Sequence, residues 1–130
     1  MGKALTATVL VSSQSVSAGG TVRGRVDVSN ADGGIVTMRI TNGATGPSTQ
    51  CVGRVLIAHK QTSMPAAASE GTGDNDWKKV YEFGNGFSAS ASSSMSWRFG
   101  REVAYVEVEF TGHTGQAVTV ESHCTSHVQA

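Results

Sequence analysis

The amino-acid sequence predicts an all-β protein, a two-sheet antiparallel β-sandwich of about eight strands. In several segments apolar and polar residues alternate with a period of two, the pattern of a half-buried strand. The 130 residues include 16 glycines but only two prolines, a composition typical of short strands joined by tight turns. No segment keeps a helical period over three turns. We expect one domain, residues 1–130, and both jelly-roll and immunoglobulin-like strand orders stay open.

The expected strands follow one another with turn residues between them. In chain order they are Leu5–Ser12, Thr21–Ser29, Ile35–Thr41, Gln50–His59, Trp77–Phe83, the segment 87–99, Glu102–Phe110 and Ala117–Cys124. In the first three, one face collects the apolar side chains. These rows are Leu5, Ala7, Val9 and Val11, then Val22, Gly24, Val26 and Val28, then Val36, Met38 and Ile40. We expect the opposite faces to be polar.

The fourth expected strand, Gln50–His59, has apolar residues on both faces. Val52, Leu56 and Ala58 lie opposite Cys51, Val55 and Ile57. A strand of this kind is covered on both sides, so we expect a central strand or one whose outer face meets a partner.

The last four strands continue the alternation. Their expected rows are Trp77, Lys79, Tyr81 and Phe83; Phe87, Ala89, Ala91, Met95, Trp97 and Phe99; Ala104, Val106, Val108 and Phe110; and Val118, Val120 and Cys124. Tyr105, Glu107 and Glu109 then fall on the outer face, and we expect the two carboxylates to face solvent. Short hydroxyl side chains form two further stretches: Ser88, Ser90, Ser92–Ser94 and Ser96, and Thr6, Thr8 and Ser12. Such small, flat faces suit close packing against another subunit, and equally suit plain exposure to solvent.

Residues 61–76 have no periodicity and predict a long surface loop. Loops of this length in compact domains are usually functional or mobile. We expect this loop and the N-terminal residues 1–4 to reach neighbouring molecules, with Trp77 as the main buried anchor. The predicted partner-binding residues are Met64, Glu70, Asp74, Asp76 and Trp77. The alternative is that Trp77 simply begins a strand and packs within its own domain.

The reactive side chains predict neither a metal site nor a cofactor. His123 and Cys124 are adjacent in a strand and point to opposite faces, which prevents them from converging on one ion with His127. Cys51 and Cys124 are expected as buried free thiols, with a single disulfide as the alternative. The acidic stretch 70–76 lacks the spacing of an EF-hand, and Ca²⁺ is a minor alternative there.

The sequence does not predict an enzyme. Glu107 and Glu109 share a face, but an open strand face provides no glycosidase cleft. No serine lies in a nucleophile elbow, and the chain has no phosphate-binding loop. Ten basic residues balance ten acidic ones and are scattered along the chain, so neither nucleic acid nor a membrane is expected as a partner.

Three blocks resemble small structural proteins of tailed bacteriophages: Val16–Val28, Val36–Pro47 and Tyr105–Glu121. They are turn-and-strand patterns that cover about a third of the chain. The resemblance implies a virion component, a capsid decoration (cement) protein that bridges major-capsid subunits as a homotrimer or homodimer. The alternatives are a tail-associated or fibre-like virion subunit, or a carbohydrate-binding module that stacks sugars on Trp77 or Tyr105.

Overall fold

The computed structural model describes residues 3–59, 63–66 and 77–129, which form an all-β structure. The strands are β1 (Lys3–Val16), β2 (Val22–Asp27), β3 (Gly33–Asn42), β4 (Val52–Ala58), β5 (Lys78–Gly84), β6 (Ser92–Gly100), β7 (Tyr105–Thr111) and β8 (Val118–Gln129). The described part of the chain contains no helix, and hence no helix capable of crossing a membrane.

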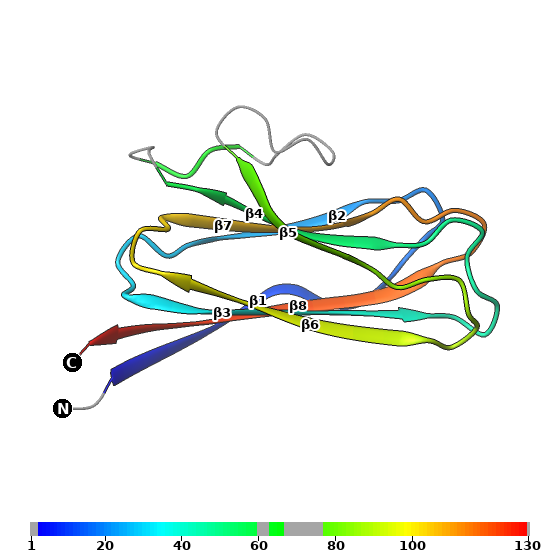
Figure 1. Ribbon diagram of the computed structural model, residues 1–130, viewed down its shortest axis with the longest axis horizontal. Helices are drawn as coiled ribbons and strands as arrows, with labels where there is room; N and C mark the ends of the chain where they lie inside the picture. Colours follow the sequence, from blue (N-terminus) through cyan, green and yellow to red (C-terminus); the bar gives the residue numbers. More distant parts are fainter. Residues whose placement is uncertain (1–2, 60–62, 67–76, 130) are drawn as a thin grey trace.

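The strands form two four-stranded antiparallel sheets, in the orders β1-β8-β3-β6 and β2-β7-β4-β5. Figure 1 shows the two sheets as stacked layers. The first four strands pair with the last four in reverse order: β1 with β8, β2 with β7, β3 with β6 and β4 with β5. A long antiparallel hairpin folded over into two sheets gives this order, which is that of the jelly roll. The predicted sandwich is confirmed, and the immunoglobulin-like order is excluded because its sheets group the strands differently.

The main core lies between the two sheets and consists of the inward rows expected from the sequence. Val36, Met38 and Ile40 of β3 are at most 3% exposed, and Val106, Val108 and Phe110 of β7 are fully buried. Val118, Val120 and Cys124 complete this core from β8. Because each row comes from alternate positions of one strand, the period of two was sufficient to predict these faces.

The strand β4 is covered on both faces, as predicted. Val55 packs in the main core, whereas Leu56 and Ala58 on the opposite face form a second cluster with Trp77 and Tyr105. Because β4 lies between β7 and β5, Tyr105 of β7 and Trp77, which precedes β5, flank Leu56 and Ala58 and cover this outer face.

The prediction that Leu5, Ala7, Val9 and Val11 share one face is wrong. The pairing of β1 with β8 shifts register between Val9 and Val11, and again between Val11 and Gln14. Val11 therefore points into the core at 3% exposure, while Leu5 and Val9 are 61% and 59% exposed. A bulge exchanges the faces of every residue beyond it, and sequence alternation alone does not reveal a bulge.

A second bulge corrects the expected row of β5. The pairing of β4 with β5 shifts between Val55 and Leu56, so Phe83 faces the main core and Trp77 faces the opposite side of the sheet. The predicted strand start at Phe87 is also wrong, since β6 begins at Ser92 and Phe87 is 59% exposed. Asn42 donates to the carbonyls of Gly86 and Ser88, which holds this segment as a loop.

Candidate interaction surface

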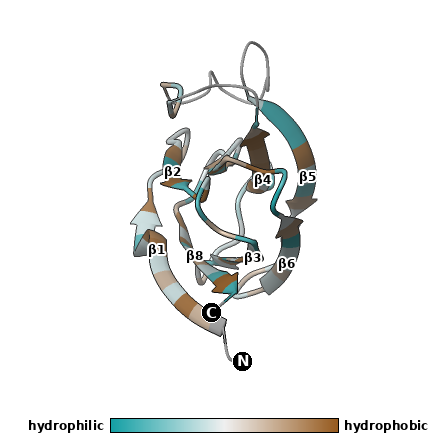
Figure 2. Cartoon of the chain, turned by 90° about the vertical axis from the view of Figure 1, so that its left-hand side faces the viewer, coloured by the Kyte–Doolittle hydropathy of each residue, from teal (hydrophilic) through white to brown (hydrophobic). Residues whose placement is uncertain are grey.

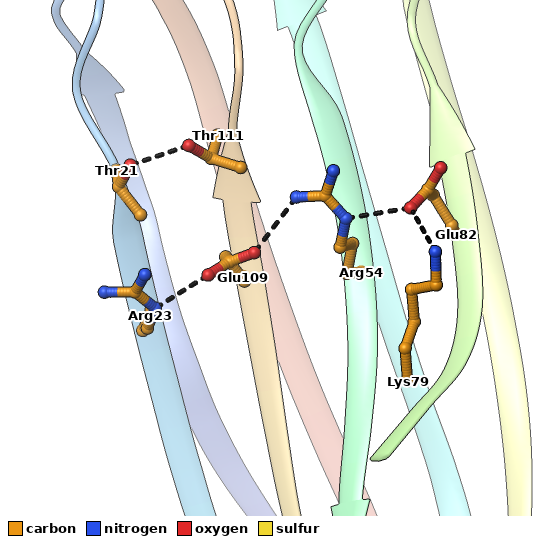
Figure 3. A network of polar contacts seen from close by, with 7 residues as sticks. All are labelled: Thr21, Arg23, Arg54, Lys79, Glu82, Glu109 and Thr111. Atoms are coloured by element: carbon orange, nitrogen blue, oxygen red, sulfur yellow. Dashed lines mark hydrogen bonds and ion pairs between the residues drawn. The ribbon is translucent and has the colours of Figure 1, made fainter. Parts of the chain in front are cut away.

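The outer faces of the two sheets differ: a described segment of the chain is attached to one of them, and none is attached to the other. On the sheet β2-β7-β4-β5, which we call the covered face, charged side chains form a ladder across all four strands (Figure 3). Glu109 of β7 accepts from Arg23 Nε at 2.8 Å and from Arg54 Nη1 at 3.0 Å. Arg54 Nε also contacts Glu82 Oε1 at 2.8 Å, and Lys79 Nζ reaches the same oxygen at 3.1 Å.

The ladder surrounds a carboxylate that has no access to solvent. Glu109 is 0% exposed, and so is its neighbour Glu107. The prediction that these two glutamates face solvent is wrong, because arginines from β2 and β4 flank the position of Glu109. An ionised carboxylate is buried at acceptable cost only when charge-assisted hydrogen bonds replace its water.

Arg54 and Glu82 change each other's pKa within the ladder. Hydrogen bonds from Arg54 and Lys79 hold the pKa of Glu82 below its usual value. The pKa of Arg54 is raised, because its bonds to Glu82 and Glu109 outweigh the cost of desolvation. Arg54 and Glu82 are thus both charged at neutral pH, and the ladder ties the strands of this sheet together.

Part of the chain lies over the covered face. Figure 1 shows the green segment 63–66 on the outer side of this sheet. Arg25 Nη1 donates to the Pro65 carbonyl at 2.6 Å, and Trp77 Nε1 donates to the Ala66 carbonyl at 2.6 Å. The two bonds attach the segment to β2 and to the start of β5, so this face is occupied by the protein itself.

The structure places the predicted partner-binding residues as follows. Met64 is 38% exposed, whereas Trp77 is 2% exposed within the second cluster, beneath the attached segment. The placement of Trp77 corresponds to the alternative in which it packs within its own domain. Tyr105, at 3% exposure, is likewise not placed to stack on a sugar. Glu70, Asp74 and Asp76 lie outside the described residues, as does most of the predicted loop 61–76.

The outer face of the sheet β1-β8-β3-β6, which we call the free face, presents mainly short side chains. Strand register places these side chains in rows across β8, β3 and β6. The rows are Thr119–Thr41–Ser92, Glu121–Arg39–Ser94, His123–Thr37–Ser96 and Thr125–Ile35–Arg98. Most of these side chains are Ser or Thr. No described segment is attached across this face in the way that 63–66 is attached to the covered face.

The middle rows of the free face enclose a shallow, open hollow of about 380 Å³. Arg39, Glu121 and His123 bring charge or a ring nitrogen to it, and His123 Nε2 lies 3.4 Å from Glu121 Oε2. No sequence pattern indicates this group, because its members come from two strands whose pairing only the fold defines.

The cysteines are placed as predicted, and so is His123 relative to Cys124. Cys51 and Cys124 are buried and unpaired, and burial raises their pKa to about 12 and about 11. His123 is exposed, opposite in orientation to buried Cys124. His127 lies within β8, which continues to Gln129, and it pairs with Leu5 and Gly33. Within the described ranges, no three His, Cys, Asp or Glu side chains group as metal ligands would.

His113 was not singled out by the sequence, yet it is fully buried. Its Nε2 lies 3.0 Å from the Val16 carbonyl and 2.9 Å from the Ser17 carbonyl. It therefore connects the turn between β7 and β8 to the end of β1. This placement is structural, because the side chain faces the body of the protein.

Comparison with known proteins supports the fold. No protein-family model matches the sequence, and no curated protein matches it either. The K3 adhesin domain of Lys-gingipain from Porphyromonas gingivalis is 9% identical, with a TM-score of 0.59 over 87% of this chain and 72% of that chain. A chain of the infectious bursal disease virus VP2 subviral particle is 8% identical, with a TM-score of 0.52 over 98% of this chain.

This chain spans 33% of the length of that viral chain. The SPBc2 prophage-derived protein YomS is 11% identical over 98% of this chain and 96% of its own, but its TM-score is only 0.48. At such low identity these likenesses concern the fold alone. The chain shares a two-sheet β-sandwich with proteins of different kinds, a bacterial adhesin domain and a viral particle among them.

Proposed function

We propose that this protein is a structural subunit of a virion, a capsid decoration (cement) protein of a tailed bacteriophage. In this proposal it binds the assembled major capsid protein through the free face and stabilises the head by bridging neighbouring subunits. It acts there as a homo-oligomer, a trimer or a dimer, and without catalysis. Its place is the virion, after synthesis in the host cytoplasm.

The observation that carries the proposal is the contrast between the two sheet faces. The covered face is occupied by the ladder, Trp77 and the segment 63–66, whereas on the free face seven of the twelve side chains in the rows across β8, β3 and β6 are Ser or Thr. Long side chains lose up to about 2 kcal/mol of conformational free energy when an interface immobilises them, and short ones lose less. The Ser and Thr side chains of the free face can therefore pack closely against another protein surface and still satisfy their polar atoms.

The fold supports the same proposal at the level of analogy. Jelly rolls occur in viral capsid and lectin domains, and the similarity to a viral particle chain agrees with this use. A decoration protein requires no catalytic group; it requires a stable scaffold and a surface repeated over many copies. Repetition on a shell makes even weak contacts effective, since each bound copy raises the local concentration of the next.

The test measures binding of the purified protein to phage shells that lack it. We expect saturation at a fixed ratio to the major capsid protein, and a rise in shell melting temperature with protein concentration. Ser94→Arg places a long charge in the middle of the free face and is expected to weaken binding at least tenfold. Ser63→Arg is the matched control, because it makes the same change in the segment above the covered face.

Each result has a distinct meaning. If the protein binds no shell, the decoration role is wrong. If Ser63→Arg rather than Ser94→Arg abolishes binding, the role stands but the surface is the covered face. If the protein is found in virions but in the tail fraction after heads and tails are separated, the tail-associated alternative is correct.

A carbohydrate-binding module is the second candidate, and the hollow on the free face favours it. Arg39, Glu121 and His123 can donate and accept hydrogen bonds around an open volume of about 380 Å³. No Trp, Tyr or Phe is among the described residues that line the hollow, and a sugar module usually stacks its ligand on such a ring. Binding on a glycan array that is lost in Arg39→Ala, with no binding to shells, would favour this candidate over the decoration role.

A further inference from the structure

The N-terminal half of β1 is an open sheet edge. β1 is the terminal strand of its sheet, and within the described ranges no strand pairs with its other edge. Exposed strand edges offer unpaired N–H and C=O groups to any chain able to extend the sheet. The free part of this edge ends near Leu10, whose carbonyl lies so close to Gly24 of β2 that a Cβ there would collide with it.

From Ala4 to Val9, between Lys3 and the register shifts of β1 that begin beyond Val9, this edge lacks the features that usually prevent two edges from pairing. Proteins protect open edges with charged residues, prolines, β-bulges or very short strands. From Ala4 to Val22 the sequence has no charged residue and no proline, and β1 has 14 residues. Figure 2 shows brown, hydrophobic bands along β1 at the rim of the sandwich. Leu5 and Val9 are 61% and 59% exposed, far above the core residues of the same sheet.

We propose that two copies of this chain pair antiparallel through the Leu5–Val9 edge of β1, with Ala7 at the two-fold axis. In this register Leu5 of each copy lies opposite Val9 of the other, and Ala7 lies opposite Ala7. These three residues share the outer face, so both copies contribute one continuous apolar row. On the opposite face Thr6 lies opposite Thr8, and cross-strand threonine pairs stabilise antiparallel sheets.

The edge is thus complementary to itself, which a two-fold symmetric interface requires. No charge is placed opposite a like charge, because the paired residues carry none. The two sheets become one continuous sheet across the dimer, which aligns the free faces of both copies side by side. The proposed function includes a homo-oligomer, either a trimer or a dimer, and this inference rests on that part of the proposal. The edge pairing specifies the oligomer as a dimer.

The size of the contact sets its strength. Stable complexes bury about 800 Å² on each partner, and a pairing of five residues buries less. We therefore expect a dimer that forms at high protein concentration and dissociates on dilution, and that is reinforced where many copies are held on one surface. Sedimentation of the full chain from about 1 µM to about 1 mM covers the range of such affinities.

Charge pairs test both the edge and the register. The double variant Leu5→Lys/Val9→Lys places like charges opposite each other twice and is expected to raise the dimer dissociation constant tenfold or more. The variant Leu5→Lys/Val9→Glu places Lys opposite Glu at both sites of the same register. We expect it to dimerise within about threefold of the parent protein at low salt, and less well at high salt.

A matched control lies on the same sheet away from the edge. Thr119→Lys adds a charge at an exposed position of β8 on the free face and should leave dimerisation unchanged. Circular dichroism and the melting temperature show whether each variant is folded. The proposal is wrong if the chain is monomeric at about 1 mM or forms a trimer. It is also wrong if the dimer persists in the variant Leu5→Lys/Val9→Lys. Failure of the Lys/Glu variant to dimerise overturns it as well. Shell binding is a separate measurement, so the proposed function can fail or stand independently.

Discussion

The buried carboxylate of the charge ladder yields a quantitative prediction. Arg54 contacts both Glu109, which is 0% exposed, and Glu82, whose side chain is 41% exposed. Arg54→Ala therefore removes one bond to a fully buried carboxylate and one to a carboxylate at the surface. Glu82→Ala is the matched control, because it removes only the second of these bonds, together with the contact to Lys79.

The two substitutions should lower the free energy of unfolding by different amounts, because Glu109 is shielded from solvent and Glu82 is not. A hydrogen bond to a charged, buried group contributes about 1.5–3 kcal/mol, and breaking a buried ion pair costs about 3–5 kcal/mol. Arg23 still reaches Glu109 at 2.8 Å after the substitution, which keeps the cost at the lower end of that range. We expect Arg54→Ala to lower the free energy of unfolding by about 3 kcal/mol, and Glu82→Ala by about 1 kcal/mol or less.

Urea denaturation at pH 7 measures both values. For a chain of this length about 3 kcal/mol corresponds to a fall in melting temperature of roughly 10 °C. Acid adds an independent check. The lowered pKa of Glu82 stabilises the fold above the usual glutamate pKa, and this stabilisation is lost as the pH falls through the folded value. Arg54→Ala should therefore flatten the loss of stability in acid. If Arg54→Ala and Glu82→Ala lower the free energy of unfolding equally, the reasoning is refuted, because the bond from Arg54 to Glu109 would then contribute nothing to stability.

Three further predictions concern side chains buried elsewhere. Trp77→Ala should lower the free energy of unfolding by about 3–5 kcal/mol and Trp77→Phe by less, measured by urea denaturation; a change below about 1 kcal/mol would return Trp77 to the role of partner anchor. Cys51 and Cys124 should resist thiol reagents at pH 8 in the folded protein. Because their folded pKa values are about 12 and about 11, their contribution to stability is full below the unfolded thiol pKa of about 9 and is lost as the pH rises through the folded values. Denaturation midpoints at pH 8 and pH 10 check this, and Cys124→Ala should reduce the difference. His113→Ala should destabilise by about 1–3 kcal/mol, since it leaves the Val16 and Ser17 carbonyls without their ring partner; unchanged stability would contradict the bracing role of His113.

The predictions that held were those that depend on one strand at a time. The inward rows of β3, β7 and β8 and the two covered faces of β4 follow from which positions along a single strand are apolar. The predictions that failed depend on pairs of strands. Leu5 and Val9 are exposed because the pairing of β1 with β8 shifts register. Trp77 and Phe83 lie on opposite faces because the pairing of β5 with β4 also shifts register. A bulge changes which face a residue occupies, and it is decided by the partner strand.

The site residues show the same division. Glu109 was expected in solvent because its own strand places it on the outer face, but the arginines that bury it come from β2 and β4. The hollow on the free face likewise joins Arg39 of β3 to Glu121 of β8, which are 82 positions apart in the sequence and directly paired in the sheet. No local pattern in the sequence records such a pairing.

The sequence by itself determined that this protein is a β-sandwich, because the alternation of side chains is a local property of an extended backbone. It also determined that β4 is covered on both faces. Only the tertiary structure decided that the strand order is that of a jelly roll and that one sheet face is covered while the other is free. It alone shows that the apolar residues of β1 lie at an open edge. Those features depend on which strands lie side by side, and hydrogen bonds between distant segments set that arrangement.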